Sequence, residues 1–128
     1  MDFDKMKEMN ALALAYLGDA VWELAVREYY VSKNLKVKDL NHKVRRFVEG
    51  KSQSKIYLEL ENEFDEKAMS VARRAKNSKM NCPKTCTVKE YKNATAFEAV
   101  IAYYYYNDKE KISKIIKKYI IEGGKNEK

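Results

Sequence analysis

Two carboxylic acids stand out because each lies within a stretch that is otherwise almost entirely apolar. Asp19 lies in residues 11–26, ALALAYLGDAVWELAV, and Glu98 lies in residues 94–106, ATAFEAVIAYYYY. If both stretches are helices, we expect both acids to face inward, where an unpaired carboxylate costs several kcal/mol. Two buried carboxylates also repel each other unless a proton or a cation lies between them. The pair therefore predicts a cation site, provided that the fold brings the two acids together. Their spacing in the sequence alone does not show whether it does.

The charge of the chain suggests what such a site would act on. The 128 residues include 26 Lys and Arg against 19 Asp and Glu, a net charge of +7, so we expect an anionic partner, most commonly nucleic acid. Mg²⁺ prefers oxygen ligands and often uses only one or two carboxylates. Mg²⁺ beside a basic surface favours phosphodiester hydrolysis, because the metal activates water and stabilises charge on the phosphate. Glu23, one helical turn after Asp19, is a candidate third acid, acting through water or as the partner of an arginine.

Each of these interpretations has an alternative. An anionic membrane surface would also attract a basic protein, and Gly18 and Asp19 would also fit a break between two helices, with Asp19 as the cap of the second. No segment reaches the roughly 18 apolar residues of a membrane span. The first ten residues, MDFDKMKEMN, do not form a signal peptide, so we expect a cytoplasmic protein without membrane association.

Cysteine and histidine lack the pattern of a metal or disulfide site. Cys82 and Cys86 lie in the segment CPKTC, and the single histidine, His42, is distant from them in the chain. Two cysteines and one histidine are too few ligands for a zinc site, which usually has four. Disulfide bonds are rare in the reducing compartment that we expect for this protein. We therefore expect two free thiols, and a histidine on the surface or at a helix cap.

The elements that carry these residues are predicted to be helices throughout. Lys, Glu, Ala and Leu are abundant, whereas there are only four Gly and one Pro, which indicates an all-α single domain over residues 1–128. The helix that contains Glu98 is apolar nearly all round and should lie at the centre of the bundle. Helices are expected at residues 4–32 (with a possible bend at Gly18), 39–49, 52–64, 65–77, 94–106 and 109–121. The expected N-caps are Ser52, Asp65, Asn93 or Thr95, and Asp108.

One long irregular segment is predicted between these helices, over about residues 77–93. A loop of that length in a small domain is usually functional or disordered. It follows a basic helix end and contains four lysines, so it is either a phosphate-contacting loop or a solvated basic loop. A short flexible tail is expected at residues 123–128.

Several motifs together resemble the ribonuclease III domain. The run Leu17-Gly18-Asp19-Ala20-Val21 is similar to the signature helix of that family, and Phe97-Glu98-Ala99-Val100-Ile101 is similar to its second catalytic helix, xEALIG. The chain lacks a double-stranded-RNA-binding domain, which is typical of the Mini-ribonuclease III branch. The segments ARRAKN at 72–77, Pro83-Lys84, and ATAFEAVIAY at 94–103 also resemble that branch. The resemblance covers nearly the whole chain.

The resemblance implies an all-α, homodimeric endonuclease in which each protomer supplies one Mg²⁺-dependent site. Asp19 and Glu98 match the acids that bind the metal. The implied substrate is double-stranded RNA, notably the precursor of large-subunit (23S) ribosomal RNA, cut to 5′-phosphate and 3′-hydroxyl ends. The family pattern has three further acids, at positions that are Leu12, Ala15 and Thr95 in this chain, so fewer carboxylates remain to hold metal. An inactive RNA- or ribosome-binding module on the same fold, or a basic helical interaction protein, are the alternatives.

A nuclease domain without a separate RNA-binding domain must hold the duplex itself. Double-stranded RNA is recognised mainly by shape, through phosphates and 2′-hydroxyls. The candidate RNA-binding residues follow the resemblance and the positive charge: Arg73, Arg74, Lys76, Asn77, Lys79 and Lys84, with Lys51 and Gln53 as weaker candidates.

Overall fold

A computed structural model describes residues 1–79 and 81–123, and within these ranges every regular element is a helix, as predicted. The elements are α1 (Phe3–Lys7), α2 (Ala11–Val31), α3 (Val37–Val48), α4 (Gly50–Leu60), η1 (Glu61–Glu63), α5 (Glu66–Lys76), α6 (Val88–Asn107), α7 (Lys109–Ile116) and η2 (Lys117–Glu122). None of these helices is long and apolar enough to cross a membrane.

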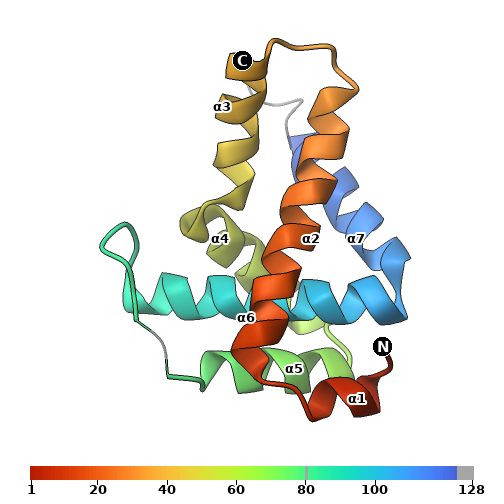
Figure 1. Ribbon diagram of the computed structural model, residues 1–128, viewed down its shortest axis with the longest axis vertical. Coiled ribbons are helices and arrows are strands. Elements are labelled where there is room, and N and C mark those ends of the chain that lie inside the picture. The colour runs from red at the N-terminus through yellow and green to blue at the C-terminus, as the bar shows by residue number, and fades with distance from the viewer. Residues whose placement is uncertain (80, 124–128) are drawn as a thin grey trace.

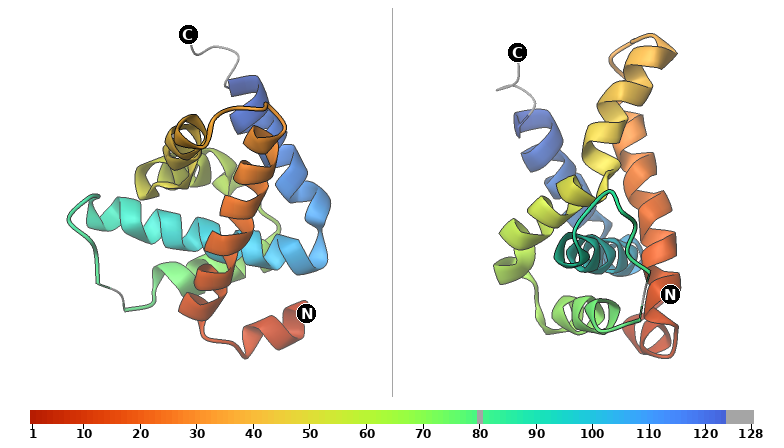
Figure 2. Two further views of the ribbon diagram at one scale, coloured as in Figure 1. Left: turned by 45° about the horizontal axis from the view of Figure 1, so that its top comes forward. Right: turned by 90° about the vertical axis from the view of Figure 1, so that its left-hand side faces the viewer.

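The apolar helix α6 lies at the centre of the bundle, as its sequence predicted. Figure 2, in its right-hand panel, looks along α6 and has α2, α4, α5 and α7 around it. Eleven of the residues of α6 are buried, from Asn93 to Tyr104, so nearly every face of the helix contacts a neighbour. Burial of this apolar surface is the main force that holds the other helices in place.

The N-terminal part of the chain forms two helices, which corrects the prediction of one helix over residues 4–32 with a bend at Gly18. The carboxamide oxygen of Asn10 accepts hydrogen bonds from the backbone N–H groups of Leu12 (2.8 Å) and Ala13 (3.4 Å), and so starts α2. Asparagine at this position is a strong N-cap, and this signal outweighed the continuous helical composition. Gly18 lies inside α2, and Asp19 therefore caps nothing.

Gly18 permits α2 to cross α6 at very short range (Figure 1). A Cβ atom at this position would overlap the backbone carbonyl of Glu98, so only glycine fits. Trp22, one turn further along α2, is fully buried, donates from Nε1 to the carbonyl of Phe47 (2.8 Å) and lies edge-on to the ring of Phe97. The crossing thus fixes the relation between the two acidic positions.

The segment between α5 and α6 is shorter than the predicted loop over 77–93. Helix α6 begins at Val88, because Thr87 and Glu90 form a capping box: the Thr87 hydroxyl accepts from the N–H of Glu90 (3.0 Å) and the Glu90 carboxylate accepts from the N–H of Thr87 (2.8 Å). Asn93 and Thr95, the predicted caps, are buried inside α6. Most of the predicted tail, residues 124–128, lies outside the described residues.

The remaining caps agree only in part with the sequence. Asp65 accepts from the N–H of Ala68 (2.8 Å) and caps α5, as predicted. Ser52 lies inside α4, where its hydroxyl donates to the carbonyl of Arg46, and Asp108 precedes α7 without a side-chain cap bond. Both cysteines are free, as expected.

Candidate active site

Asp19 of α2 and Glu98 of α6 line the same pocket. The sequence alone could not show that these two residues lie close together. The pocket has a volume of about 460 Å³ and lies at the crossing of the two helices. The segment before α6 contributes Lys79 and Asn81 to its wall. Its lining residues are Leu12, Ala15, Tyr16, Asp19, Lys79, Asn81, Tyr91, Thr95 and Glu98.

The two acids differ in burial, which corrects the expectation that both face the core. Asp19 is exposed, and Tyr16, three residues before it on the same side of α2, is 85% exposed. The reason is that, within residues 1–79 and 81–123, no helix packs on this side of α2 (Figure 2). Glu98 is half-buried on the inner wall of the pocket. One carboxylate is therefore open to a ligand from solvent, and the other is largely desolvated.

The pKa of Glu98 is raised to about 9, mainly by burial and in smaller part by the neighbouring carboxyl of Asp19, through a hydrogen bond and through charge repulsion. Gln53 acts in the opposite direction, since its amide favours the ionised form of Glu98. Nε2 of Gln53 is close enough for that effect but makes no hydrogen bond of normal geometry. Without a cation, Glu98 therefore holds a proton at neutral pH.

The donor set fits a hard divalent cation with few protein ligands. No group of three or more His, Cys, Asp or Glu side chains gathers within residues 1–79 and 81–123. Asp19 and Glu98 provide two carboxylates, which is sufficient for Mg²⁺ with water completing its shell. Glu23, the predicted third acid, does not line the pocket and pairs with Arg27 at 2.8 Å.

The three positions where the family pattern has further acids are in the pocket as well. Leu12, Ala15 and Thr95 all line it, and the Thr95 hydroxyl donates to the carbonyl of Tyr91 (2.8 Å). The pocket therefore has uncharged side chains at the three positions where the resemblance implies further carboxylates.

The basic candidates divide into those near the pocket and those engaged elsewhere. Lys79 lines the pocket itself, and Arg73 and Asn77 line a second hollow that is also bordered by Asn10 and Ala11, at the start of α2. The two hollows thus lie on either side of the first turn of α2. The remaining candidates are Lys84 and Lys51, both exposed, and Lys76, which pairs with Glu61 at 3.7 Å and lies over the ring of Tyr57.

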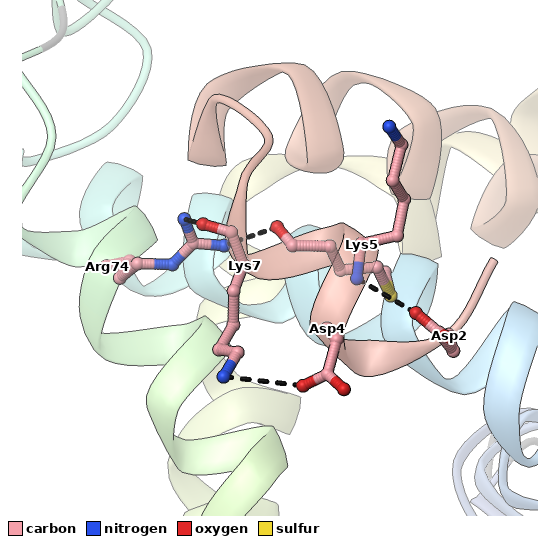
Figure 3. Close-up of polar contacts among 6 residues, drawn as sticks. Asp2, Asp4, Lys5, Lys7 and Arg74 are labelled. Atoms are coloured by element: carbon pink, nitrogen blue, oxygen red, sulfur yellow. Dashed lines mark hydrogen bonds and ion pairs between the residues drawn. The ribbon is translucent and has the colours of Figure 1, made fainter.

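Arg74 lines the second hollow together with Arg73, and its guanidinium also makes structural hydrogen bonds to the end of α1. Its guanidinium donates to the carbonyls of Met6 (2.9 Å), Lys7 (3.0 Å) and Met9 (3.0 Å), at the end of α1. Figure 3 shows the guanidinium turned toward α1. Carbonyls at a helix end lack the full set of helical partners, and Arg74 supplies donors to these three. Gln53 is likewise buried rather than on the surface, with 2% of its side chain exposed.

Three pocket residues were not among the sequence candidates: Tyr16, Asn81 and Tyr91. Tyr91, Thr95 and Glu98 are separated by four and three residues, so they lie on one face of α6. That signal was hidden because the helix was predicted to start after Tyr91. Asn81 follows Lys79 in an irregular segment, where spacing carries no comparable information.

Comparisons with known proteins point to one family. The ribonuclease III domain model matches residues 12–109. A Mini-ribonuclease 3-like protein of Ilyobacter polytropus is 48% identical over 122 residues, which cover 94% of this chain and 96% of the relative. A Mini-ribonuclease 3 of Clostridium tetani is 39% identical over 116 residues, 88% of this chain and 77% of the relative. A crystal structure of a Fusobacterium nucleatum protein has a TM-score of 0.85 at 43% identity and covers 92% of this chain and 96% of that one.

Proposed function

The chain belongs to the ribonuclease III domain family and is an endoribonuclease, and on that premise we propose that it cuts double-stranded RNA with Mg²⁺ bound between Asp19 and Glu98. The observation that carries the proposal is the placement of these two acids in one pocket with Lys79. The products would have 5′-phosphate and 3′-hydroxyl ends.

The metal requirement follows from the electrostatics of the pocket. Ribonuclease III enzymes generally depend on divalent metal ions. The raised pKa of Glu98 means that its carboxylate lacks a compensating positive charge in the bare protein. Bound Mg²⁺ would supply that charge, activate water and stabilise the phosphate in the transition state. Asp19, being exposed, would bind from the solvent side, while Glu98 would bind from the inner wall.

The basic residues around the pocket would hold the duplex. Lys79 is within the pocket and can contact the phosphate that is cut, whereas Arg73 and Asn77 border the neighbouring hollow and can contact phosphates further along the strand. Lys76 and Lys84 remain candidates for the same surface, and Lys51 is a weaker one. Contacts of this kind position the duplex without reading its sequence.

Cleavage of both strands requires two sites, which we propose are supplied by a homodimer. The side of α2 that no other described helix covers carries large apolar residues at helical spacing: Tyr16 is 85% exposed, Leu24 57% and Val31 63%. Such a stripe is typical of a subunit interface. Because Tyr16 also lines the pocket, the interface would border the active site.

Sedimentation velocity of two matched variants tests the dimer. Leu24→Asp places a charge in the exposed stripe of α2, and Leu58→Asp places one at a site on α4 that is 50% exposed and outside the stripe. We expect a dimer for the wild type and for Leu58→Asp, and a monomer with little paired-strand cleavage for Leu24→Asp. A monomeric wild type at micromolar concentration would contradict the proposal.

The cleavage test compares wild type, Asp19→Asn and Glu23→Gln on a long RNA duplex with Mg²⁺. Both substitutions remove one charge from α2 and keep the side-chain shape, but only Asp19 lines the pocket. We expect wild type and Glu23→Gln to cut and Asp19→Asn to bind RNA without cutting. If wild type binds RNA and does not cut it, the protein is an inactive binding module on the same fold.

We further propose that the natural substrate is the precursor of 23S ribosomal RNA in the cytoplasm. This proposal rests on the resemblance to the Mini-ribonuclease III branch and on the names of the relatives, both of which contain "Mini-ribonuclease 3". Mapping the ends of 23S RNA in cells that lack the protein tests it. Mature ends in such cells would contradict this substrate while leaving duplex cleavage intact.

A further inference from the structure

Gln53 is a buried polar side chain whose place in the structure differs from its predicted role. It lies on α4, which packs against α6, and only 2% of it is exposed. Its Nε2 has no hydrogen-bond partner within the described part of the chain. A buried donor without an acceptor is costly, so its presence calls for a group that accepts its hydrogen bond in another state of the protein.

The group that Gln53 faces is the carboxyl of Glu98. Gln53 does not line the pocket, so it cannot touch a ligand there and can act on one only through Glu98. Gln53 belongs to α4 and Asp19 to α2, so the two residues reach Glu98 from different helices. A carboxylate has two oxygens, so Glu98 can accept a hydrogen bond with one and bind a cation with the other.

A second buried polar contact joins the same two helices beside Gln53. Nδ2 of Asn93 on α6 donates to the hydroxyl of Ser54 on α4 at 3.2 Å, and both side chains are buried. This bond sets the register of α4 against α6 one residue away from Gln53. Burial limits the freedom of the Gln53 amide, whereas the side chain of Glu98 is half-buried, has three rotatable bonds and needs an orienting partner.

We propose that Gln53 is a positioning residue that holds the Glu98 carboxylate in the orientation that binds the divalent cation. Its Nε2–H donates to one carboxylate oxygen and turns the other toward Asp19. This inference rests on the proposed function, since it requires a cation between Asp19 and Glu98. Hydrogen-bond donors behind metal-binding carboxylates orient them in this way, and their loss typically weakens metal binding about 10- to 100-fold.

Metal binding without RNA provides the test, with free Mn²⁺ counted by electron paramagnetic resonance. Gln53→Met keeps an unbranched side chain of similar length and removes the donor. Gln53→Asn keeps the amide but is one methylene shorter, so it cannot reach Glu98. We expect both variants to bind Mn²⁺ about 10-fold more weakly than the wild type. In cleavage assays both should need about 10-fold more Mg²⁺ for half-maximal rate, with the rate at saturating Mg²⁺ largely retained.

Ser54→Ala is the matched control, because it removes a buried polar contact between the same two helices without touching Glu98. We expect it to lower thermal stability and to leave Mn²⁺ affinity unchanged. Equal weakening of Mn²⁺ binding by Ser54→Ala and Gln53→Met would overturn the positioning role in favour of general packing. Wild-type affinity in Gln53→Met, or in Gln53→Leu if the Met variant does not fold, would overturn it too. A wild-type protein that binds no Mn²⁺ would overturn this inference together with the proposed metal site, whereas the other outcomes leave that site standing.

Discussion

Gly18→Ala adds a single methyl group where α2 crosses α6, and we expect it to reduce both stability and cleavage. The added Cβ would overlap the carbonyl oxygen of Glu98, lie 2.5 Å from its carbonyl carbon and 3.2 Å from the nitrogen of Ala102. Ordinary contacts begin near 3.4 Å, so the carbonyl carbon alone requires the helices to separate by about 0.9 Å, and the overlapping oxygen requires more. Both neighbours are backbone atoms, which cannot rotate out of the way as a side chain would.

The expected loss of stability is the difference between two opposing terms. Overpacking of a well-packed contact costs about 1–3 kcal/mol, and a backbone-to-backbone contact belongs at the upper end. Alanine in place of glycine inside a helix stabilises the helix by about 1 kcal/mol. The net change is about 2 kcal/mol, which lowers the melting temperature of a domain of this size by about 5–10 °C.

Catalysis should suffer more than stability. The separation moves Asp19 relative to Glu98, and a misplacement of about 1 Å in a catalytic arrangement can reduce the rate about 100-fold. Gly50→Ala is the control, since its added Cβ would lie 3.6 Å from the sulfur of Cys86, an ordinary contact. Thermal unfolding and initial rates of duplex cleavage are measured for all three proteins. A Gly18→Ala protein with wild-type stability and rate would refute the close crossing, and lost stability with a wild-type rate would refute its role in placing the acids.

Three further outcomes are expected. The pKa of Glu98, raised to about 9 by burial and by Asp19, means that ionisation destabilises the metal-free fold increasingly as pH rises from about 4.5 toward 9. In urea denaturation at pH 8, the free energy of unfolding of Glu98→Gln should therefore exceed that of the wild type by about 1–3 kcal/mol. At pH 4 the two proteins should have the same free energy of unfolding. Arg74→Ala should accelerate hydrogen exchange in α1 and cost about 1–3 kcal/mol, because three carbonyls lose their donor, while the salt dependence of RNA binding stays as in the wild type. Lys79→Ala should lower the slope of log affinity against log salt by about one, and Lys117→Ala, outside the pocket, should not; equal slopes for both would contradict a phosphate contact at Lys79.

The helical fold could be predicted because composition and periodicity agree along most of the chain. The apolar stretch around Glu98 indicated a central helix, and Asp65 indicated a helix start, and both predictions are confirmed. The helix boundaries near the site were wrong where a local cap decided them. Asn10 and Thr87 each begin a helix through side-chain hydrogen bonds that a composition-based assignment overlooked.

The candidate site was predictable only as separate parts. Asp19 and Glu98 stood out as acids in apolar stretches, but their meeting depends on the crossing at Gly18, which is a tertiary contact. The exposure of Asp19 depends on which side of α2 the other helices leave open. Residue type cannot separate Arg73 from Arg74, since adjacent positions on a helix face different directions and only the structure shows that Arg74 faces α1.

Trp22 gives the protein a built-in optical reporter of this crossing. It is the only tryptophan in the chain, it lies three residues after Asp19, and its ring meets that of Phe97, the neighbour of Glu98, with centroids 4.9 Å apart. Excitation at the red edge of the absorption band selects it from the ten tyrosines. Its emission should shift when α2 moves against α6, so metal and RNA titrations can be followed in the unlabelled protein.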